Sequence, residues 1–188
     1  MHIGFYSIHC LMAIRVRVKL SSIMGKVTII KALVTTGYYR KFGEPITRED
    51  LEKFGNKIQR NYVVMLYTGF SRAWSTEEFL YNWPYLDRSG ADYLIERKIR
   101  AVGIEALSIA GWPGKEGYPY PSRVARDDVA YVHYKLLSNG IYVIEGAANL
   151  DMALSKCKDG EGLFLFAPLK IRGAEGSPVR LLMMCESK

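Results

Sequence analysis

Short apolar runs alternate along the chain with segments that have the period of an amphipathic helix. The runs are rich in β-branched residues and are bounded by glycine or polar residues, which is typical of buried strands. On this basis we expect strands at residues 26–33, 62–67, 101–104, 141–144, 163–167 and 179–184. Helical segments lie between them at residues 47–54, 89–98 and 127–139. The alternation predicts an α/β fold with a mixed sheet and flanking helices.

The predicted helices have recognisable ends. Thr47 and Asp50 have the spacing of a capping box at the start of the first helix. Within the second helix, Tyr93 and Leu94 occupy positions that would face the core. Gly140 follows the third helix and predicts its C-terminal stop.

Two segments break the periodic pattern. Residues 71–84 hold Trp74 and Trp83 among polar residues, which indicates a loop anchored by bulky side chains. Residues 111–126 are rich in proline and glycine and have neither the strand period nor the helix period. Loops of this length inside compact domains are commonly functional, so we expect the second segment to lie at the mouth of a site.

Aromatic side chains of the second loop are candidates for a substrate pocket. They are Trp112, Tyr118 and Tyr120, which come shortly before the helix at residues 127–139. Aromatic and apolar side chains line most small-molecule sites. The same side chains could equally pack against the end of the sheet, and the sequence leaves both roles open.

Size and charge narrow the range of functions. With 188 residues, of which 49% are hydrophobic, the chain can form one globular domain with its own core. Its 26 basic and 19 acidic residues give a formal charge of +7, but the basic residues are spread over the whole length. This distribution favours a solvated surface over a nucleic-acid site. No apolar run approaches the roughly 20 residues that cross a bilayer, so we expect neither a nucleic-acid nor a membrane partner.

The cysteines give no sign of a zinc site or a disulfide framework. Cys10, Cys157 and Cys185 are odd in number, lie far apart and have no CxxC spacing. We therefore expect ordinary free thiols and a location in the reducing environment of the cytoplasm.

His133 and Glu145 are the strongest candidates for chemistry. They lie twelve positions apart across the passage from a predicted helix to a predicted strand. Imidazole and carboxylate groups together suit a divalent metal such as zinc or manganese. A lone histidine on a helix is more commonly a structural residue, and a glutamate at a strand end commonly caps neighbouring backbone. A metal site would need further ligands.

Three ordered blocks of sequence resemble the cyclase family, which includes the kynurenine formamidases. The blocks are AVGIEALSI at residues 101–109, VHYKLLSNGIYVIEGAANLD at 132–151 and PLKIRGAEGSPVR at 168–180. The shorter segments ITREDLE and VVMLYTGF support them. The resemblance extends from about residue 25 to residue 184. It divides the chain into an atypical N-terminal segment, 1–24, and a cyclase-like domain, 25–188.

The resemblance implies a fold and an activity. Members of the family have a swivelling β/β/α fold, are usually homo-oligomers, and hydrolyse amide-like bonds with a bound divalent metal. Their substrates include N-formylkynurenine, an aryl-formamide of tryptophan catabolism. A helix histidine and a strand glutamate at this separation are metal ligands in the family, which implies that role for His133 and Glu145. The expected mechanism is attack of a metal-activated water on a polarised carbonyl.

The N-terminal segment departs from the family pattern. The remaining family ligands come from an HxGTHxD motif, and the nearest string here begins at His2 and Gly4. Phe5, Tyr6 and Ile8 stand where the motif has threonine, histidine and aspartate. We expect either that the true metal motif lies upstream of Met1 or that a frameshift has replaced it, so that the chain is N-terminally truncated. Reading the DNA upstream of Met1 in all three frames for an intact HxGTHxD motif would test this. The sequence does not assign a catalytic residue.

Two functions from different classes remain open. The first is a metal-dependent hydrolase resembling kynurenine formamidase, impaired here by an incomplete metal site. The second is a catalytically silent protein of cyclase fold that serves as a structural or interaction module. Metal content after dialysis would separate the two.

Overall fold

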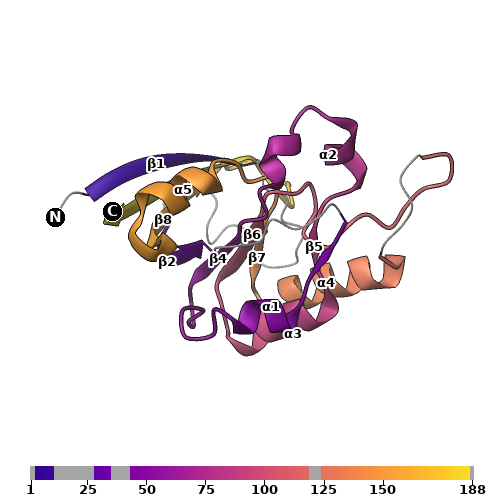
Figure 1. Cartoon of the computed structure of the whole chain (residues 1–188), viewed down its shortest axis with the longest axis horizontal. Coiled ribbons are helices and arrows are strands. Elements are labelled where there is room, and N and C mark those ends of the chain that lie inside the picture. The colour runs from indigo at the N-terminus through magenta and orange to yellow at the C-terminus, as the bar shows by residue number, and fades with distance from the viewer. Residues whose placement is uncertain (1–2, 11–27, 35–42, 119–123, 187–188) are drawn as a thin grey trace.

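A mixed sheet forms the centre of the computed structural model, which describes residues 3–10, 28–34, 43–118 and 124–186 (Figure 1). For residues 3–10 and 28–34 the backbone alone is described. Across these residues the sheet has seven strands in the order β1-β9-β8-β2-β4-β6-β7. The strands are β1 Ile3–Cys10, β2 Thr28–Val34, β4 Val63–Leu66, β6 Ala101–Ile104, β7 Tyr142–Ile144, β8 Glu161–Pro168 and β9 Val179–Glu186.

The two halves of the sheet have different hydrophobic patterns. The parallel strands β4, β6 and β7 are buried at every position, because they are covered on both faces. The antiparallel strands β8 and β9 alternate between buried and more exposed positions. Because of this alternation, one face of the β8–β9 pair packs on the core and the other face is more exposed. Strand β1 extends this half by pairing antiparallel to β9.

Helices lie on both sides of the parallel strands. Figure 1 shows α1 (Arg48–Glu52), α3 (Arg88–Glu96) and α4 (Arg126–Ser138) grouped below them, and α2 (Glu77–Tyr81) and α5 (Leu150–Lys156) above. The helix α3 contacts both α1 and α4, and α4 contacts β7. The short strands β3 (Pro45–Ile46) and β5 (Tyr85–Leu86) pair in parallel beside this lower layer. The 3-10 turns η2 (Phe70–Ala73) and η3 (Lys158–Gly160) complete the order.

Local signals account for the starts of α1 and α3. Thr47 and Asp50 form both bonds of the predicted capping box at α1. Asp87 accepts the amide of Gly90 and so caps α3. A Cβ added at Gly90 would lie 2.8 Å from the carbonyl oxygen of Ile46, so glycine permits the close packing of this helix on the small sheet. Gly140, with φ of +73°, ends α4 as predicted.

The predicted strands and helices are confirmed to within a few residues, and the mixed α/β fold is confirmed with them. The expected loop at residues 71–84 is wrong in part, since it contains the helix α2 capped by Thr76. The helix α5 was not predicted. Its N-cap Asn149 is of a residue type that commonly starts helices. The backbone of Asn149 is left-handed and its side chain makes no capping bond, so the start of α5 does not use that signal.

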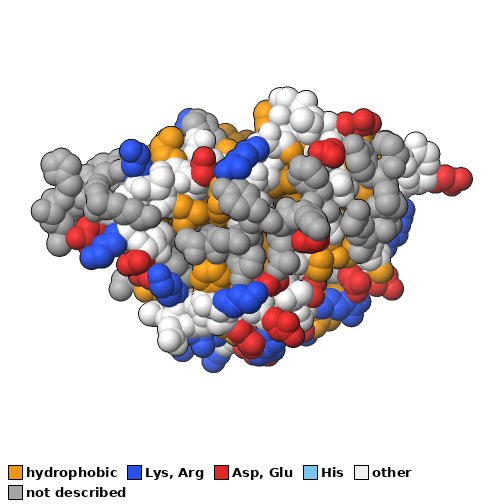
Figure 2. All heavy atoms as spheres, in the orientation of Figure 1, with side chains coloured by type: hydrophobic (Ala, Val, Ile, Leu, Met, Phe, Trp, Pro, Cys, Tyr) orange, Lys and Arg blue, Asp and Glu red, His pale blue; other side chains and the backbone are white. Residues whose placement is uncertain are grey.

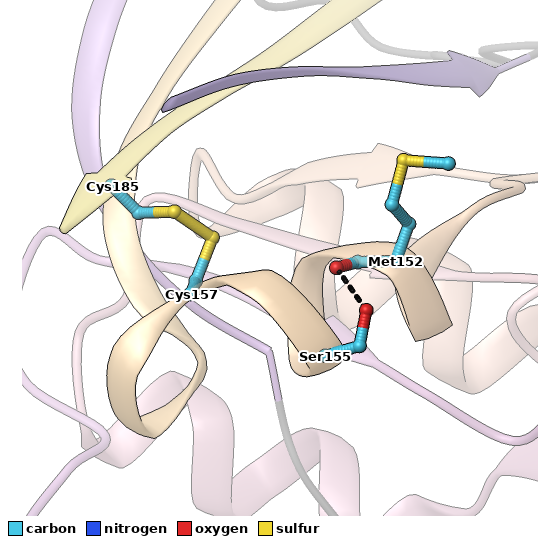
Figure 3. Close-up of a disulfide and its surroundings, with 4 residues drawn as sticks. All are labelled: Met152, Ser155, Cys157 and Cys185. Atoms are coloured by element: carbon cyan, nitrogen blue, oxygen red, sulfur yellow. Dashed lines mark hydrogen bonds between the residues drawn. A yellow bond between two sulfur atoms is a disulfide. The ribbon is translucent and has the colours of Figure 1, made fainter. Parts of the chain in front are cut away.

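The prediction of free thiols is wrong for two of the three cysteines. A disulfide joins Cys157 at the end of α5 to Cys185 in β9 (Figure 3). Both side chains are buried, and their Cα atoms lie 5.5 Å apart, within the usual range for a disulfide. The two residues are separated by 28 positions. They become neighbours because α5 packs back over the sheet, which spacing alone did not indicate.

Charged side chains of both signs are interspersed on the described part of the face in Figure 2. Several form pairs, such as Arg48 with Glu52 and Arg88 with Asp128. Within the described ranges, no helix has the length and apolarity required to cross a membrane.

Candidate functional site

Polar side chains follow the parallel strands β4, β6 and β7 at the same edge of the sheet. Thr68 comes two residues after β4, while Glu105 and Glu145 come directly after β6 and β7. All three are buried. In open α/β sheets, ligands bind outside the carboxyl ends of the strands. This edge therefore contains the candidate sites of the molecule.

His133 and Glu145 lie in contact across the passage from α4 to β7. The Nε2 atom of His133 lies 3.3 Å from Oε1 of Glu145. On the other side of the ring, Nδ1 lies 3.0 Å from the carbonyl oxygen of Val129, one helical turn earlier. Because a carbonyl can only accept, Nδ1 carries a hydrogen and Nε2 is the nitrogen that faces the carboxylate.

Glu145 is held from behind by the backbone. Its Oε1 accepts the amide hydrogen of Ile109 at 2.9 Å, and only 8% of the side chain is exposed. His133 is half-buried, with 32% of its side chain exposed. The pair is therefore fixed in orientation and still open on the imidazole side. Backing contacts of this kind orient metal-ligating side chains in proteins.

Burial and hydrogen bonding act in opposite directions on the pKa of His133. Burial alone lowers it, because the charged imidazolium loses solvent. The bonds to Glu145 and to the Val129 carbonyl favour the charged form, and together they raise the pKa above its ordinary value of 6.5. In the absence of metal, the pair thus holds a proton more firmly than an isolated histidine does.

The donor set fits a divalent metal. Two ligand atoms bound tetrahedrally at about 2.0–2.1 Å lie about 3.3–3.4 Å apart, which matches the 3.3 Å between Nε2 and Oε1. Among the residues that the structure describes, no group of three or more His, Cys, Asp or Glu side chains is arranged to hold a metal ion. His2 lies outside those residues, and only the backbone of 3–8 is described. The pair supplies two donor atoms, and a metal site would need further ligands.

The predicted pocket residues Trp112 and Tyr118 lie together in an aromatic cluster. With Tyr81 and Trp83 they form edge or tilted contacts with ring centroids 5.0–6.1 Å apart. The indole nitrogens of Trp83 and Trp112 have no hydrogen-bond partner within the described residues. Trp112 lies three positions after Ile109, whose amide binds Glu145. Tyr120 lies outside the described residues.

Sequence reasoning missed a second group of residues at this edge. Glu105 is fully buried and accepts three hydrogen bonds, from the amide and hydroxyl of Thr68 and from the hydroxyl of Ser71. Glu105 and Ser71 line a cavity of about 690 Å³. The only signal in the sequence was a carboxylate directly after the apolar run of β6.

Residues 8–110 match the family described as "Putative cyclase". The chain belongs to this cyclase family. It is 30% identical over 146 residues to an uncharacterized protein of Methanocaldococcus jannaschii, covering 78% of this chain and 65% of that protein. It is 27% identical over 138 residues to the kynurenine formamidase of Bacillus cereus strain ATCC 14579, covering 71% of this chain and 57% of that formamidase. The chain thus spans less than two thirds of the length of these relatives.

Solved structures of cyclase-family hydrolases share the fold. Isatin hydrolase A from Ralstonia solanacearum aligns with a TM-score of 0.65 at 20% identity, covering 84% of this chain and 60% of its own. A structure described as a potential metal-dependent hydrolase with cyclase activity aligns with a TM-score of 0.63 at 18% identity, covering all of both chains. Because the sequence identities are only 18–20%, the similarity to these structures shows a shared fold and nothing further.

Proposed function

We propose that this cyclase-family chain is a metal-dependent hydrolase of an aryl-formamide or a similar amide, with His133 and Glu145 as two of the metal ligands. The observation that carries the proposal is the approach of Nε2 to Oε1 at 3.3 Å, with each side chain held from behind by backbone. Relatives named kynurenine formamidase and solved structures described as metal-dependent hydrolases support it.

The residues of the pair have separable roles in this proposal. A divalent zinc or manganese ion would supply Lewis-acid chemistry to the hydrolysis of an amide. Val129 fixes the imidazole ring so that Nε2 faces outwards from α4, and Ile109 fixes the carboxylate. His133 must release the proton that it shares with Glu145 before its Nε2 can bind metal. Metal affinity therefore rises with pH through the titration of His133.

The aromatic cluster of Tyr81, Trp83, Trp112 and Tyr118 is the proposed contact surface for the aryl group of the substrate. It follows the strand end that supplies the Ile109 amide, so it lies along the chain next to the metal pair. Aromatic rings provide flat apolar contact for an aryl ligand.

Metal content measured by mass spectrometry after dialysis against zinc or manganese tests the proposal. We expect bound metal in the wild-type protein, and at least a tenfold lower metal affinity in His133→Ala and Glu145→Gln, because each removes one ligand. Tyr134→Ala is the matched control, since Tyr134 is the next residue on α4 and is 72% exposed. Hydrolysis of N-formylkynurenine should follow metal content across the four proteins. A metal-free wild-type protein that does not hydrolyse this substrate would instead support the silent cyclase-fold module.

A further inference from the structure

The cavity beside Glu105 lies on the face of the sheet opposite to the metal pair. Gly103 of β6 and Ile144 of β7 are paired in register. Glu145 follows this pair by one position and Glu105 by two, so alternation directs their side chains to opposite faces. The contacts agree, because Glu145 reaches His133 on α4 while Glu105 reaches Ser71 in η2. In Figure 1, α4 lies below the central strands, and α2, which follows η2, lies above them.

Three parts of the chain form the walls of this cavity. The η2–α2 segment contributes Trp74 and Phe79, the turn into α5 contributes Ala148, and the β8–β9 hairpin contributes Leu169 and Val179. Neither His133 nor Glu145 is among the described lining residues. The volume of about 690 Å³ is within the range of small-molecule sites. The walls are mainly apolar, which suits the body of an organic ligand.

Ser71 is a hydrogen-bond acceptor at the Glu105 end of the cavity. Ser71 donates its hydroxyl hydrogen to Oε1 of Glu105 at 2.7 Å, so only lone pairs of Ser71 Oγ face the cavity. No donor among the described residues reaches this oxygen. The hydroxyl of Thr68 is already used, since it donates to Glu105 and accepts from the amide of Phe70. A hydroxyl that donates to a carboxylate is polarised and becomes a stronger acceptor.

The charge of Glu105 has no cationic partner within the described part of the chain. The side chain is 0% exposed, and its three hydrogen bonds come from an amide and two hydroxyls. A buried carboxylate is stabilised by an opposite charge. The other charged residues that line the cavity are Arg72, Arg180 and Asp151. With Glu105 they sum to zero, so the lining has no excess of positive charge that would repel a cation.

We propose that this cavity is a second ligand site, which binds a small apolar molecule that carries a protonated amine. The ammonium donates to Ser71 Oγ and is attracted by the Glu105 charge behind it, while the apolar body packs against Trp74 and Phe79. The site does not rest on the proposed metal chemistry, because it lies on the other face of the sheet.

Trp74 provides a fluorescence signal from the cavity wall. The wild-type protein is titrated with 2-phenylethylamine and with 2-phenylethanol, which has the same body and no charge. We expect the amine to bind at least tenfold more tightly, because a charge-assisted hydrogen bond is worth about that factor. The Trp74→Phe variant lacks this fluorescence signal. Calorimetry of that variant with the same amine measures whether it still binds. Equal affinity for the amine and the alcohol, or no binding of the amine, would overturn the proposal.

Three variants assign the binding to this cavity. Ala148→Phe places a ring in the cavity and should abolish binding, and Glu105→Gln should remove the preference for the amine. His133→Ala is the matched control and should bind the amine as the wild type does, even if it no longer binds metal. Unchanged binding in Ala148→Phe would overturn the proposal. If Glu105→Gln does not fold, Ala148→Phe and the comparison of amine with alcohol decide the question.

Discussion

At the scale of single residues, two contacts set the protonation of the His133 ring, one from its own helix and one from beyond the next strand. The Val129 carbonyl lies on its own helix, and the Glu145 carboxylate lies beyond the next strand. The first sets which ring nitrogen carries the hydrogen, and the second determines how firmly the other nitrogen holds a proton. Burial works against both, but their combined effect raises the pKa. The same two contacts would orient Nε2 towards a metal.

The titration of His133 in metal-free protein tests this balance. Because the folded pKa is raised above the ordinary 6.5, we expect a midpoint above that value by NMR and a lower midpoint in Glu145→Gln. The contribution of the pair to stability is fully present below pH 6.5 and is lost as the pH rises through the folded pKa. Urea denaturation should therefore show a larger difference between wild type and Glu145→Gln at pH 6 than at pH 9. An equal difference at both values would contradict the assignment.

At the scale of elements, α5 is a helix whose start has no side-chain capping bond. It lies between the cavity at its N-terminal end and a disulfide at its C-terminal end. Within it, Ser155 bonds the carbonyl of Met152, as Figure 3 shows. Long-range contacts therefore hold this helix in place. Helices of this length derive most of their stability from such packing.

Loss of the disulfide should lower the free energy of unfolding by about 3–4 kcal/mol, the value for a closed loop of this size. Cys157→Ser, Cys185→Ser and the double variant should lose similar amounts in urea denaturation, because any of them removes the same link. Chemical counting of thiols in denatured protein should give one without reduction and three after reduction, since the sequence has three cysteines. Three thiols without reduction would show that the link does not form in solution.

At the scale of the whole molecule, several large apolar side chains remain on the surface. They are Trp74, Leu80, Met152, Leu169 and Ile171, each at least 42% exposed. Trp74 and Leu169 line the cavity, and Met152 directly follows the lining residue Asp151. Contiguous exposed apolar surface commonly marks an interaction site. The resemblance to the cyclase family led us to expect a homo-oligomer.

Sedimentation equilibrium tests the oligomeric state directly. We expect a mass that is a multiple of the 21.3 kDa of one chain at micromolar concentration. Trp74→Ser should shift the equilibrium towards the monomer if this apolar surface forms the contact, and Tyr134→Ser is an exposed aromatic control on α4. A mass of one chain at every concentration would reject the oligomer.

The sequence by itself determined the elements whose signals are local. Buried strands such as β4 and β6 have continuous apolar runs, and the start of α1 has its capping box. The pair of His133 and Glu145 could also be identified from the sequence, because one helix and the strand that follows it fix the distance between the two side chains. The cyclase-family resemblance came from the same ordered segments. The strands, the capping box and the His133–Glu145 pair each depend on residues that are close together in the chain.

Only the tertiary structure decided which distant residues meet. Cys157 and Cys185 meet because α5 packs back on the sheet, and Ser71 meets Glu105 because β4 and β6 are parallel neighbours. The strand register also placed Glu105 and Glu145 on opposite faces of one edge, which separates the cavity from the metal pair. Such contacts arise from the packing of whole elements against each other. Side-chain type and local spacing do not specify that packing.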